Sequence, residues 1–298
     1  MFIDIHSHTR LMGGPPRFHL DNLPYANPDE LWEGYQRIGV ERAVLLPRGN
    51  PECAYSIQSN EEVLYLATKY PFIPFCNMDP RSMSNSVNSP FERVFKYYRD
   101  KGCKGVGEVA CNMLVGDPLV QAMFAGAEAA DMPVTIHMSP YIGHEYGLVD
   151  NAGLPQLEAT LQRFPKLKIF GHSQTFWAEM AANPSITDRM GYPKGKIQEE
   201  GRVPQLLRKY EFLYGDLSAG SGFNALMRDR EYAVKFLNEF QDKLFFGTDV
   251  ASPKGHMDVV LLTLANFLLD LRKTGEISET VFQKIARENA IRILGLDA

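Results

Sequence analysis

The sequence predicts an α/β fold of the (β/α)8 TIM-barrel type in one domain. Short apolar runs of strand length recur along the 298 residues, and a segment with helical spacing of apolar residues follows each run. Strands that alternate with helices form a parallel sheet, and a closed barrel of about 250 residues is the common solution for eight such units. An open, doubly wound sheet is the alternative, but no Gly-x-Gly-x-x-Gly motif follows the first run. No linker or repeat divides residues 1–298, so we expect a single domain.

The expected strands are short runs rich in Val, Ile, Leu and Phe, residue types that favour extended structure. Turn-forming or polar residues bound most of these runs, which limits each one to strand length. In chain order they cover residues 2–5, 42–46, 72–76, 104–109, 133–137, 167–171, 211–217 and 243–249.

The segments between these strands carry the expected helices. Residues 27–39 begin with Asn-Pro, a helix-start signal, and place Leu31, Tyr35 and Ile38 on one face. Apolar positions three and four apart predict further helices over residues 59–70, 117–132, 154–164, 203–210, 224–240 and 257–273. A final amphipathic segment, 278–296, is expected to pack on the outside of the barrel. Residues 182–202 have no regular pattern, and we interpret them as a lid.

The composition argues against several classes of function. The formal net charge is −5 and no run of Lys or Arg could follow a phosphate backbone, so nucleic acid is not an expected partner. No apolar run reaches the roughly 18 residues of a membrane span, and no signal-peptide pattern opens the chain. The four cysteines have no Cys-x-x-Cys spacing and suit a reducing compartment. We therefore expect a cytoplasmic protein that acts on a small molecule, and a homo-oligomer is compatible with the sequence.

Two histidines end the first expected strand, in the stretch MFIDIHSHTR. Strand side chains alternate between faces with a period of two, so His6 and His8 leave the chain on the same side. The two imidazoles could therefore converge on one metal ion. A pair of ordinary polar residues at a strand end is the alternative, and the rest of the chain must decide between them.

Other metal-ligand residue types stand at the carboxyl ends of later strands, where barrel enzymes carry their active sites. They are Glu108 after the fourth strand, His137 after the fifth, His172 after the sixth and Asp249 after the eighth. Each one alone has a structural explanation: a buried hydrogen-bonded histidine, a turn cap, or a partner for a nearby Lys or Arg. Together with the histidine pair they predict a catalytic metal centre, since imidazole and carboxylate donors suit a borderline divalent ion such as Zn²⁺.

Such a centre activates water for attack on a substrate. A bound metal lowers the pKa of its water toward about 7 and polarises a carbonyl or phosphoryl oxygen. A carboxylate beside that water, here Asp249, can take its proton and return it to the leaving group.

The motifs of the whole chain resemble the amidohydrolase superfamily, and most of all the amidohydrolase-related branch that includes aminocarboxymuconate semialdehyde decarboxylase. The motifs are DIHSH, SNEEVLYLATKYPFIPFCNMDP, VTIH, IFGHSQTFW, FFGTDVASP and ENAIRILGL. The resemblance implies that His6, His8 and His137 are metal ligands and that Asp249 is both a ligand and the proton shuttle. It also implies a catalytic role for His172, which would bind a second metal or hydrogen-bond the water and substrate.

The number of metal ions depends on Glu108. In two-metal relatives a carboxylate after the fourth strand bridges the ions, and the stretch GVGEVA looks like the glutamate version of that motif. In the branch that the chain most resembles, one ion is usual. We therefore expect one Zn²⁺, with Glu108 as an additional ligand and a second ion only if it bridges.

Residues beyond the strand ends are candidates for substrate binding. They are Arg10, Arg48, Tyr141, His144 and Trp177. An arginine at this rim could hold a carboxylate or phosphate in a bidentate fork, although each side chain could equally brace a loop. Asp216 also ends a strand, and we interpret it as bracing the site instead of binding the metal.

The leading functional hypothesis is a metal-dependent hydrolase acting on an amide, lactone or ester. The alternative is a lyase that decarboxylates an unsaturated or aromatic acid on the same site, because fold and ligands do not separate these reactions. A metal-binding barrel without catalysis, serving as a sensor or scaffold, is a third hypothesis.

Overall fold

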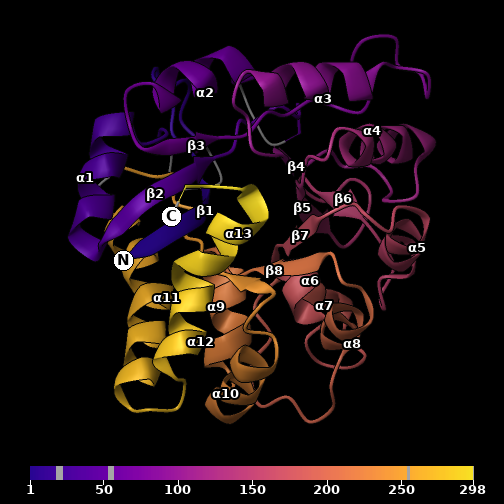
Figure 1. The fold of residues 1–298 in the computed structure, drawn as a ribbon. Helices are drawn as coiled ribbons and strands as arrows, with labels where there is room; N and C mark the ends of the chain where they lie inside the picture. The colour runs from indigo at the N-terminus through magenta and orange to yellow at the C-terminus, as the bar shows by residue number, and fades with distance from the viewer. Residues whose placement is uncertain (18–22, 53–56, 254–255, 298) are drawn as a thin grey trace.

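The computed structural model describes residues 1–17, 23–52, 57–253 and 256–297, and its centre is a ring of parallel strands (Figure 1). One sheet has the order β1-β2-β3 and the other contains β4-β5-β7-β8-β9. These strands are β1 (Phe2–Ser7), β2 (Val40–Leu45), β3 (Phe72–Pro74), β4 (Val106–Val109), β5 (Val134–Ser139), β7 (Ile169–His172), β8 (Leu213–Asp216) and β9 (Leu244–Phe245).

Backbone contacts join the two sheets into a closed barrel. On one side Cys76, just past β3, forms a parallel bridge to Val106 of β4. On the other side Ser7 of β1 bridges to Val250, and the Ile5 amide donates to the Phe246 carbonyl at 3.1 Å. The predicted (β/α)8 barrel is confirmed. A further two-residue strand, β6 (Leu148–Val149), pairs with β5 beyond the ring, and it is too short to leave a pattern in the sequence.

Helices surround the ring, and most of them bury an apolar face against it. Up to residue 209 they are α1 (Pro28–Ile38), α2 (Asn60–Ala67), α3 (Phe91–Asp100), α4 (Pro118–Ala129), α5 (Pro155–Arg163), α6 (Gln174–Ala178), α7 (Ile186–Met190) and α8 (Arg202–Lys209). The start signals read from the sequence are real caps: Asn27 completes a capping box with Glu30, and Ser59 and Asp117 accept amide hydrogen bonds at the starts of α2 and α4.

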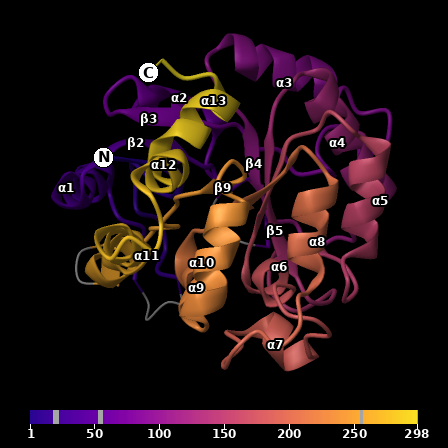
Figure 2. The same ribbon diagram turned by 60° about the horizontal axis from the view of Figure 1, so that its bottom comes forward.

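Several segments differ from the expected elements, and the helices α3 and α6 were not among those expected. Residues 224–240 do not form one helix: α9 (Ala219–Met227) ends and α10 (Arg230–Glu239) begins, with Asp229 as the cap that accepts from the Tyr232 amide. Residues 182–202 contain α7, and Ala181 pairs with Glu200 across the base of the segment. Figure 2 shows α7 at the periphery, away from the C-terminal helices.

The C-terminal segment covers one opening of the barrel. After α11 (His256–Lys273) it forms α12 (Glu279–Gln283), a π-helical turn (Lys284–Glu288) and α13 (Asn289–Leu294). Ala290 and Leu294 join a buried cluster with the inward-facing residues of the ring, among them Ile3, Phe170 and Phe245. The segment thus lies outside the ring, as expected, but α13 crosses its opening (Figure 1).

Cys76, Cys103 and Cys111 are buried free thiols, while Cys53 lies outside the described residues. Among the described residues, no helix combines the length and apolar character that crossing a bilayer requires.

Candidate metal centre

His6 and His8 point their Nε2 atoms at each other from the end of β1, 3.2 Å apart and fully buried. The Nδ1 of His8 lies 2.9 Å from the Leu46 carbonyl, which can only accept, so Nδ1 carries the proton. The Nδ1 of His6 lies 2.6 Å from the Asp216 carboxylate and donates in the same way. When both imidazoles are neutral, each Nε2 therefore has a lone pair, and the two are directed at the same point.

Two carboxylates face this pair of nitrogens. Asp249 Oδ1 lies 3.4 Å from the Nε2 of His6 and 3.3 Å from that of His8. Glu108 Oε2 lies 3.8 Å and 3.5 Å from the same two atoms. Side chains from β1, β4 and the loop after β9 thus converge at the carboxyl ends of the strands.

The local sequence after β9 turns Asp249 into the barrel. Asp249 has a φ of 54°, a left-handed conformation that is uncommon for residues other than glycine, and its amide donates to the His6 carbonyl at 2.8 Å. At Gly247 a Cβ atom would stand 2.8 Å from Asp216 Oδ1, so a side chain there would displace the carboxylate that holds His6.

His137 and His172 occupy paired positions on the neighbouring strands β5 and β7. The Nδ1 of His137 lies 2.7 Å from Glu108 Oε1, and the Nδ1 of His172 lies 2.9 Å from Ser218 Oγ. The Nε2 of His172 lies 3.7 Å from Asp249 Oδ2.

The structure therefore brings all six predicted strand-end residues together. Their donor atoms form three overlapping groups, each within 4.8 Å: His6, His8 and Glu108; His6, His172 and Asp249; and Glu108, His137 and His172. Imidazole nitrogens with free lone pairs and carboxylate oxygens at these separations fit a divalent cation.

The charges in the centre favour a bound cation. Burial raises the pKa of Glu108, but the charge of Arg48 and the adjacent imidazoles of His137 and His6 outweigh it and hold that pKa well below its usual range. In the same way the charge of His6 and the adjacent imidazoles of His172 and His8 hold the pKa of Asp249 well below normal despite burial. Both carboxylates are thus ionised.

The two histidines of the pair have opposite pKa shifts. Burial and the nearby charge of Arg48 lower the pKa of His8 to about 4, which keeps it neutral and able to bind a metal. Burial also works against the charge on His6, but the carboxylates of Asp249, Asp216 and Glu108 raise its pKa well above the usual value. Without a cation, His6 takes up a proton in response to this surplus of negative charge.

Arg48 is the predicted binding residue that lies nearest the centre. It is buried, and its Nη1 lies 2.6 Å from the same Glu108 oxygen that faces the histidine pair. Glu108 is thus both a potential ligand and the partner of an arginine, the two interpretations that the sequence left open. Its Oε2 has lone pairs already in use, which limits its capacity to bridge two ions.

A cavity of about 430 Å³ opens onto the centre. His137, His172, Asp249 and Arg48 line it, together with side chains that the sequence did not single out. These are Arg17, Glu145, Tyr146, Gln174, Tyr192 and Met257. Tyr192 comes from the segment 182–202, so the expected lid contributes to the cavity wall.

The other predicted binding residues lie elsewhere. Trp177 was expected at the rim, but it is packed in the core, where its Nε1 donates to the Asp216 carbonyl at 2.9 Å. Arg10 is buried over the ring of Tyr25 and does not line the cavity. Tyr141 is exposed and stacks on His144, which lines a smaller adjoining pocket.

The residues that the sequence missed left weak signals. Asp216 is not one of them, because we interpreted it from the sequence as bracing the site, and its carboxylate does hold His6. Arg17 and Tyr192 lie in long loops whose path no periodicity predicts. Tyr146 follows β5 by a few residues, near Tyr141 and His144, but nothing in the sequence favours one of these aromatic residues over another.

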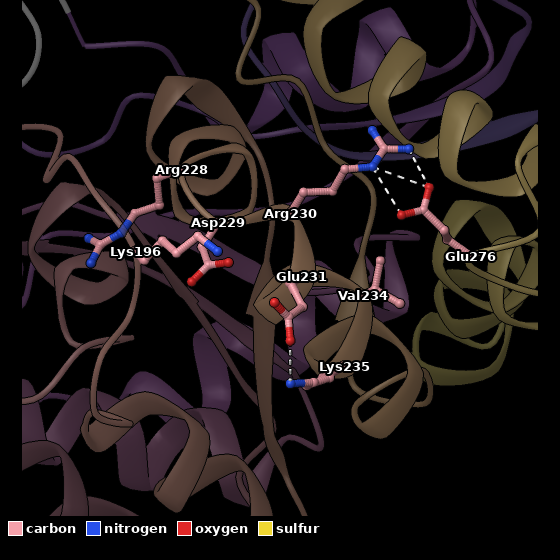
Figure 3. A pocket seen from close by; sticks show the side chains of 8 residues that line it. All are labelled: Lys196, Arg228, Asp229, Arg230, Glu231, Val234, Lys235 and Glu276. Carbon is pink, nitrogen blue, oxygen red and sulfur yellow. Dashed lines mark hydrogen bonds and ion pairs between the residues drawn. The ribbon is translucent and has the colours of Figure 1, made fainter.

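A larger surface hollow of about 530 Å³ lies over α10 and shares no lining residue with the metal centre (Figure 3). Among its charged side chains, Arg230 pairs with Glu276 and Glu231 pairs with Lys235. This hollow contains no group of metal ligands within the described residues.

Solved structures with the same fold include both uncharacterised proteins and decarboxylases. An uncharacterised TIM-barrel protein from Bordetella bronchiseptica is 18% identical over 99% of this chain and 98% of its own, with a TM-score of 0.65. The 5-carboxyvanillate decarboxylase of Sphingomonas paucimobilis is 15% identical over 99% of both chains, with a TM-score of 0.57. A dihydroxybenzoic acid decarboxylase from Polaromonas sp. JS666, with bound manganese and the inhibitor 2-nitroresorcinol, is 14% identical over 99% of this chain and 96% of its own, with a TM-score of 0.55.

No curated protein matches the chain in sequence. The family model described as amidohydrolase, however, matches residues 3–296, nearly the full length. This match agrees with the barrel and with the ligand-type residues at its strand ends. The chain therefore belongs to the amidohydrolase family.

Proposed function

We propose that the protein is a metal-dependent decarboxylase that removes CO2 from a small aromatic or unsaturated carboxylic acid without oxidation. The similarity to decarboxylases of aromatic acids supports the lyase at least as well as the hydrolase that the sequence favoured first. The observation that carries the proposal is a buried guanidinium, Arg17, in the wall of the cavity that contains the candidate metal centre.

Arg17 is suited to an acidic substrate because its guanidinium lies over the ring of Tyr25 and has no ion-pair partner among the described residues. Its guanidinium is 3% exposed and donates to the carbonyls of Leu23, Pro24 and Ala251 and to Ser252. No carboxylate of the described residues forms an ion pair with it. A buried cation beside a cavity is stabilised by an anion, and a carboxylate is one of the anions that a guanidinium binds in a bidentate fork.

The cation would be held by side chains of the centre, drawn from His6, His8, His137, Asp249 and Glu108. When bound, it would fix a substrate oxygen and draw electron density away from the reacting carbon. We propose one divalent ion, with Zn²⁺ and Mn²⁺ as the two to test, since the similar Polaromonas decarboxylase holds manganese.

The reaction needs a proton but no oxidant. The bond between the carboxylate and its carbon breaks, CO2 leaves, and the electron pair left on that carbon takes up a proton. We assign the holding and passing of this proton to Asp249 Oδ2 and His172 Nε2, which lie 3.7 Å apart at the cavity. Solvent restores the proton after each turnover.

Hydrolysis of an amide, lactone or ester is the second candidate. The position of Asp249 beside the histidine pair favours it, because a carboxylate there can also take a proton from an attacking water. The two reactions differ in their products: decarboxylation releases CO2, whereas hydrolysis places an oxygen from water in the product.

The test is to incubate the metal-loaded protein with carboxyl-¹³C hydroxybenzoates and unsaturated acids in ¹⁸O water. We expect ¹³CO2 and a product that lacks ¹⁸O. Asp249→Asn should lower the rate by roughly 10²–10⁴-fold, while Asp242→Asn, a surface change at the Lys284 ion pair, should not. Products carrying ¹⁸O, with no ¹³CO2, would replace the lyase by the hydrolase.

A further inference from the structure

A small pocket of about 140 Å³ adjoins the cavity of the metal centre. His137, Glu145, Tyr146 and Gln174 line both spaces, so the pocket is a side extension of the cavity. It can take a substituent of a molecule that occupies the cavity.

Ser139 supplies an unpaired hydroxyl to this pocket. It ends β5 two residues after His137, so both side chains leave the strand on the same side. Ser139 is 1% exposed, and its Oγ has no hydrogen-bond partner in the part of the chain that the structure describes. Buried hydroxyls are nearly always paired, which indicates that the partner of Ser139 is a bound molecule or water.

Arg189, from α7, forms another part of the wall and brings little net charge. Its Nη2 donates to the Asp150 carbonyl at 2.8 Å, and its Nε lies 3.3 Å from a carboxylate oxygen of the buried Glu179. The exposed carboxylate of Glu145 also lines the pocket. The positive charge of the guanidinium is thus offset by these carboxylates, which would repel a further anion in the pocket.

We propose that this pocket binds a hydroxyl substituent of the substrate through Ser139. A hydroxyl both donates and accepts, as Ser139 does, and it brings no charge into a pocket that is already balanced. The inference rests on the proposed function only in taking the substrate to be an aromatic acid. Arg17 would hold an acidic group in the main cavity, while Ser139 selects acids that carry a hydroxyl.

The experiment measures the binding of benzoate, its 2-, 3- and 4-hydroxy derivatives and isophthalate to the Mn²⁺-loaded protein by calorimetry. At least one hydroxybenzoate should bind roughly fivefold to tenfold more tightly than benzoate, the effect of one hydrogen bond. Isophthalate, which offers a second carboxylate, should show no such gain. Ser139→Ala should bring the ratio for the preferred hydroxybenzoate close to one.

Thr135→Val is the matched control. Thr135 lies on the same strand, is 1% exposed and also has an unpaired hydroxyl among the described residues, but it lines neither space. Its replacement should leave the ratio unchanged. Ser139→Cys keeps the packing and weakens the hydrogen bond, so it should lose the preference even if Ser139→Ala does not fold.

The assignment is overturned if no hydroxybenzoate binds more tightly than benzoate, or if the preference persists in both Ser139 variants. Release of CO2 is measured separately. A preference that depends on Ser139 in a protein that releases no CO2 would retain the pocket assignment and remove the decarboxylase.

Discussion

Asp216 lies behind His6, with its Oδ2 2.6 Å from the Nδ1 of the imidazole. The carboxylate is fully buried, and its pKa is lowered because the charge of His6 outweighs the effect of burial. It thereby orients His6 and makes its Nε2 more basic, as carboxylates behind metal-bound histidines do.

Replacement of Asp216 by Asn should weaken metal binding by roughly 10- to 100-fold without removing a ligand. The measurement is competition with a chelator of known affinity, with the Asp242→Asn surface variant as the control. Unchanged affinity would mean that His6 does not bind the metal.

Elemental analysis should find one equivalent of divalent metal per chain. The reason is that Arg48 Nη1, at 2.6 Å, already occupies the Glu108 oxygen that a bridge would need. Glu108→Gln should leave this number at one or reduce it. Two equivalents in the wild type that fall to one in Glu108→Gln would instead show bridging.

Arg17→Met should raise KM for an acidic substrate by about 10- to 100-fold, with a smaller effect on kcat, because Arg17 would bind the acid in the ground and transition states alike. Arg42→Met is the control, since Arg42 donates to the Asp297 carbonyl and does not line the cavity. Equal changes in both variants would contradict a role for Arg17 in binding.

Lys243 makes stability depend on pH. Burial lowers its pKa from 10.5 to about 8, while its Nζ donates to the Leu207 and Tyr210 carbonyls. Between pH 8 and about 10.4 the unfolded chain keeps this proton and the folded chain releases it, so the Lys243 contribution to stability rises with pH. The free energy of unfolding of the wild type, relative to Lys243→Met, should therefore increase between pH 7.5 and 10 in urea titrations. If the free energies of unfolding of the two proteins change in parallel over this pH range, the lowered pKa of Lys243 is refuted.

Leu294→Ala should destabilise the protein by about 2–4 kcal/mol because it leaves a cavity in the cluster under α13. Urea unfolding at pH 7.5 measures the change. Ile186→Ala, at an exposed position of α7, should cost much less, and a similar cost for both would mean that α13 is not part of the cooperative fold.

The sequence predicted the strand-end residues of the site well because a barrel imposes the rule that decides their position. Once the strands were placed, His137 and Asp249 had to stand near His6, although they are far apart in the chain. The roles of these residues as ligands and acid–base groups stay predictions until metal and activity are measured.

Residues on loops and helix ends could not be predicted in the same way. Trp177 follows β7 closely, yet the short helix α6 turns it into the core and leaves Gln174 at the cavity. Asp229 divides 224–240 because a capping hydrogen bond competes with helix continuation, which apolar periodicity does not register.

The position of α13 affects how the protein is made. The inward-facing residues of β1 share a buried cluster with Ala290 and Leu294 of α13, which are synthesised much later. A chain still being translated can form the strands that carry the histidines, but it cannot cover the barrel interior beneath them. A chain that lacks α13 would therefore keep all the proposed metal ligands but leave an apolar core open, a state prone to aggregation and proteolysis.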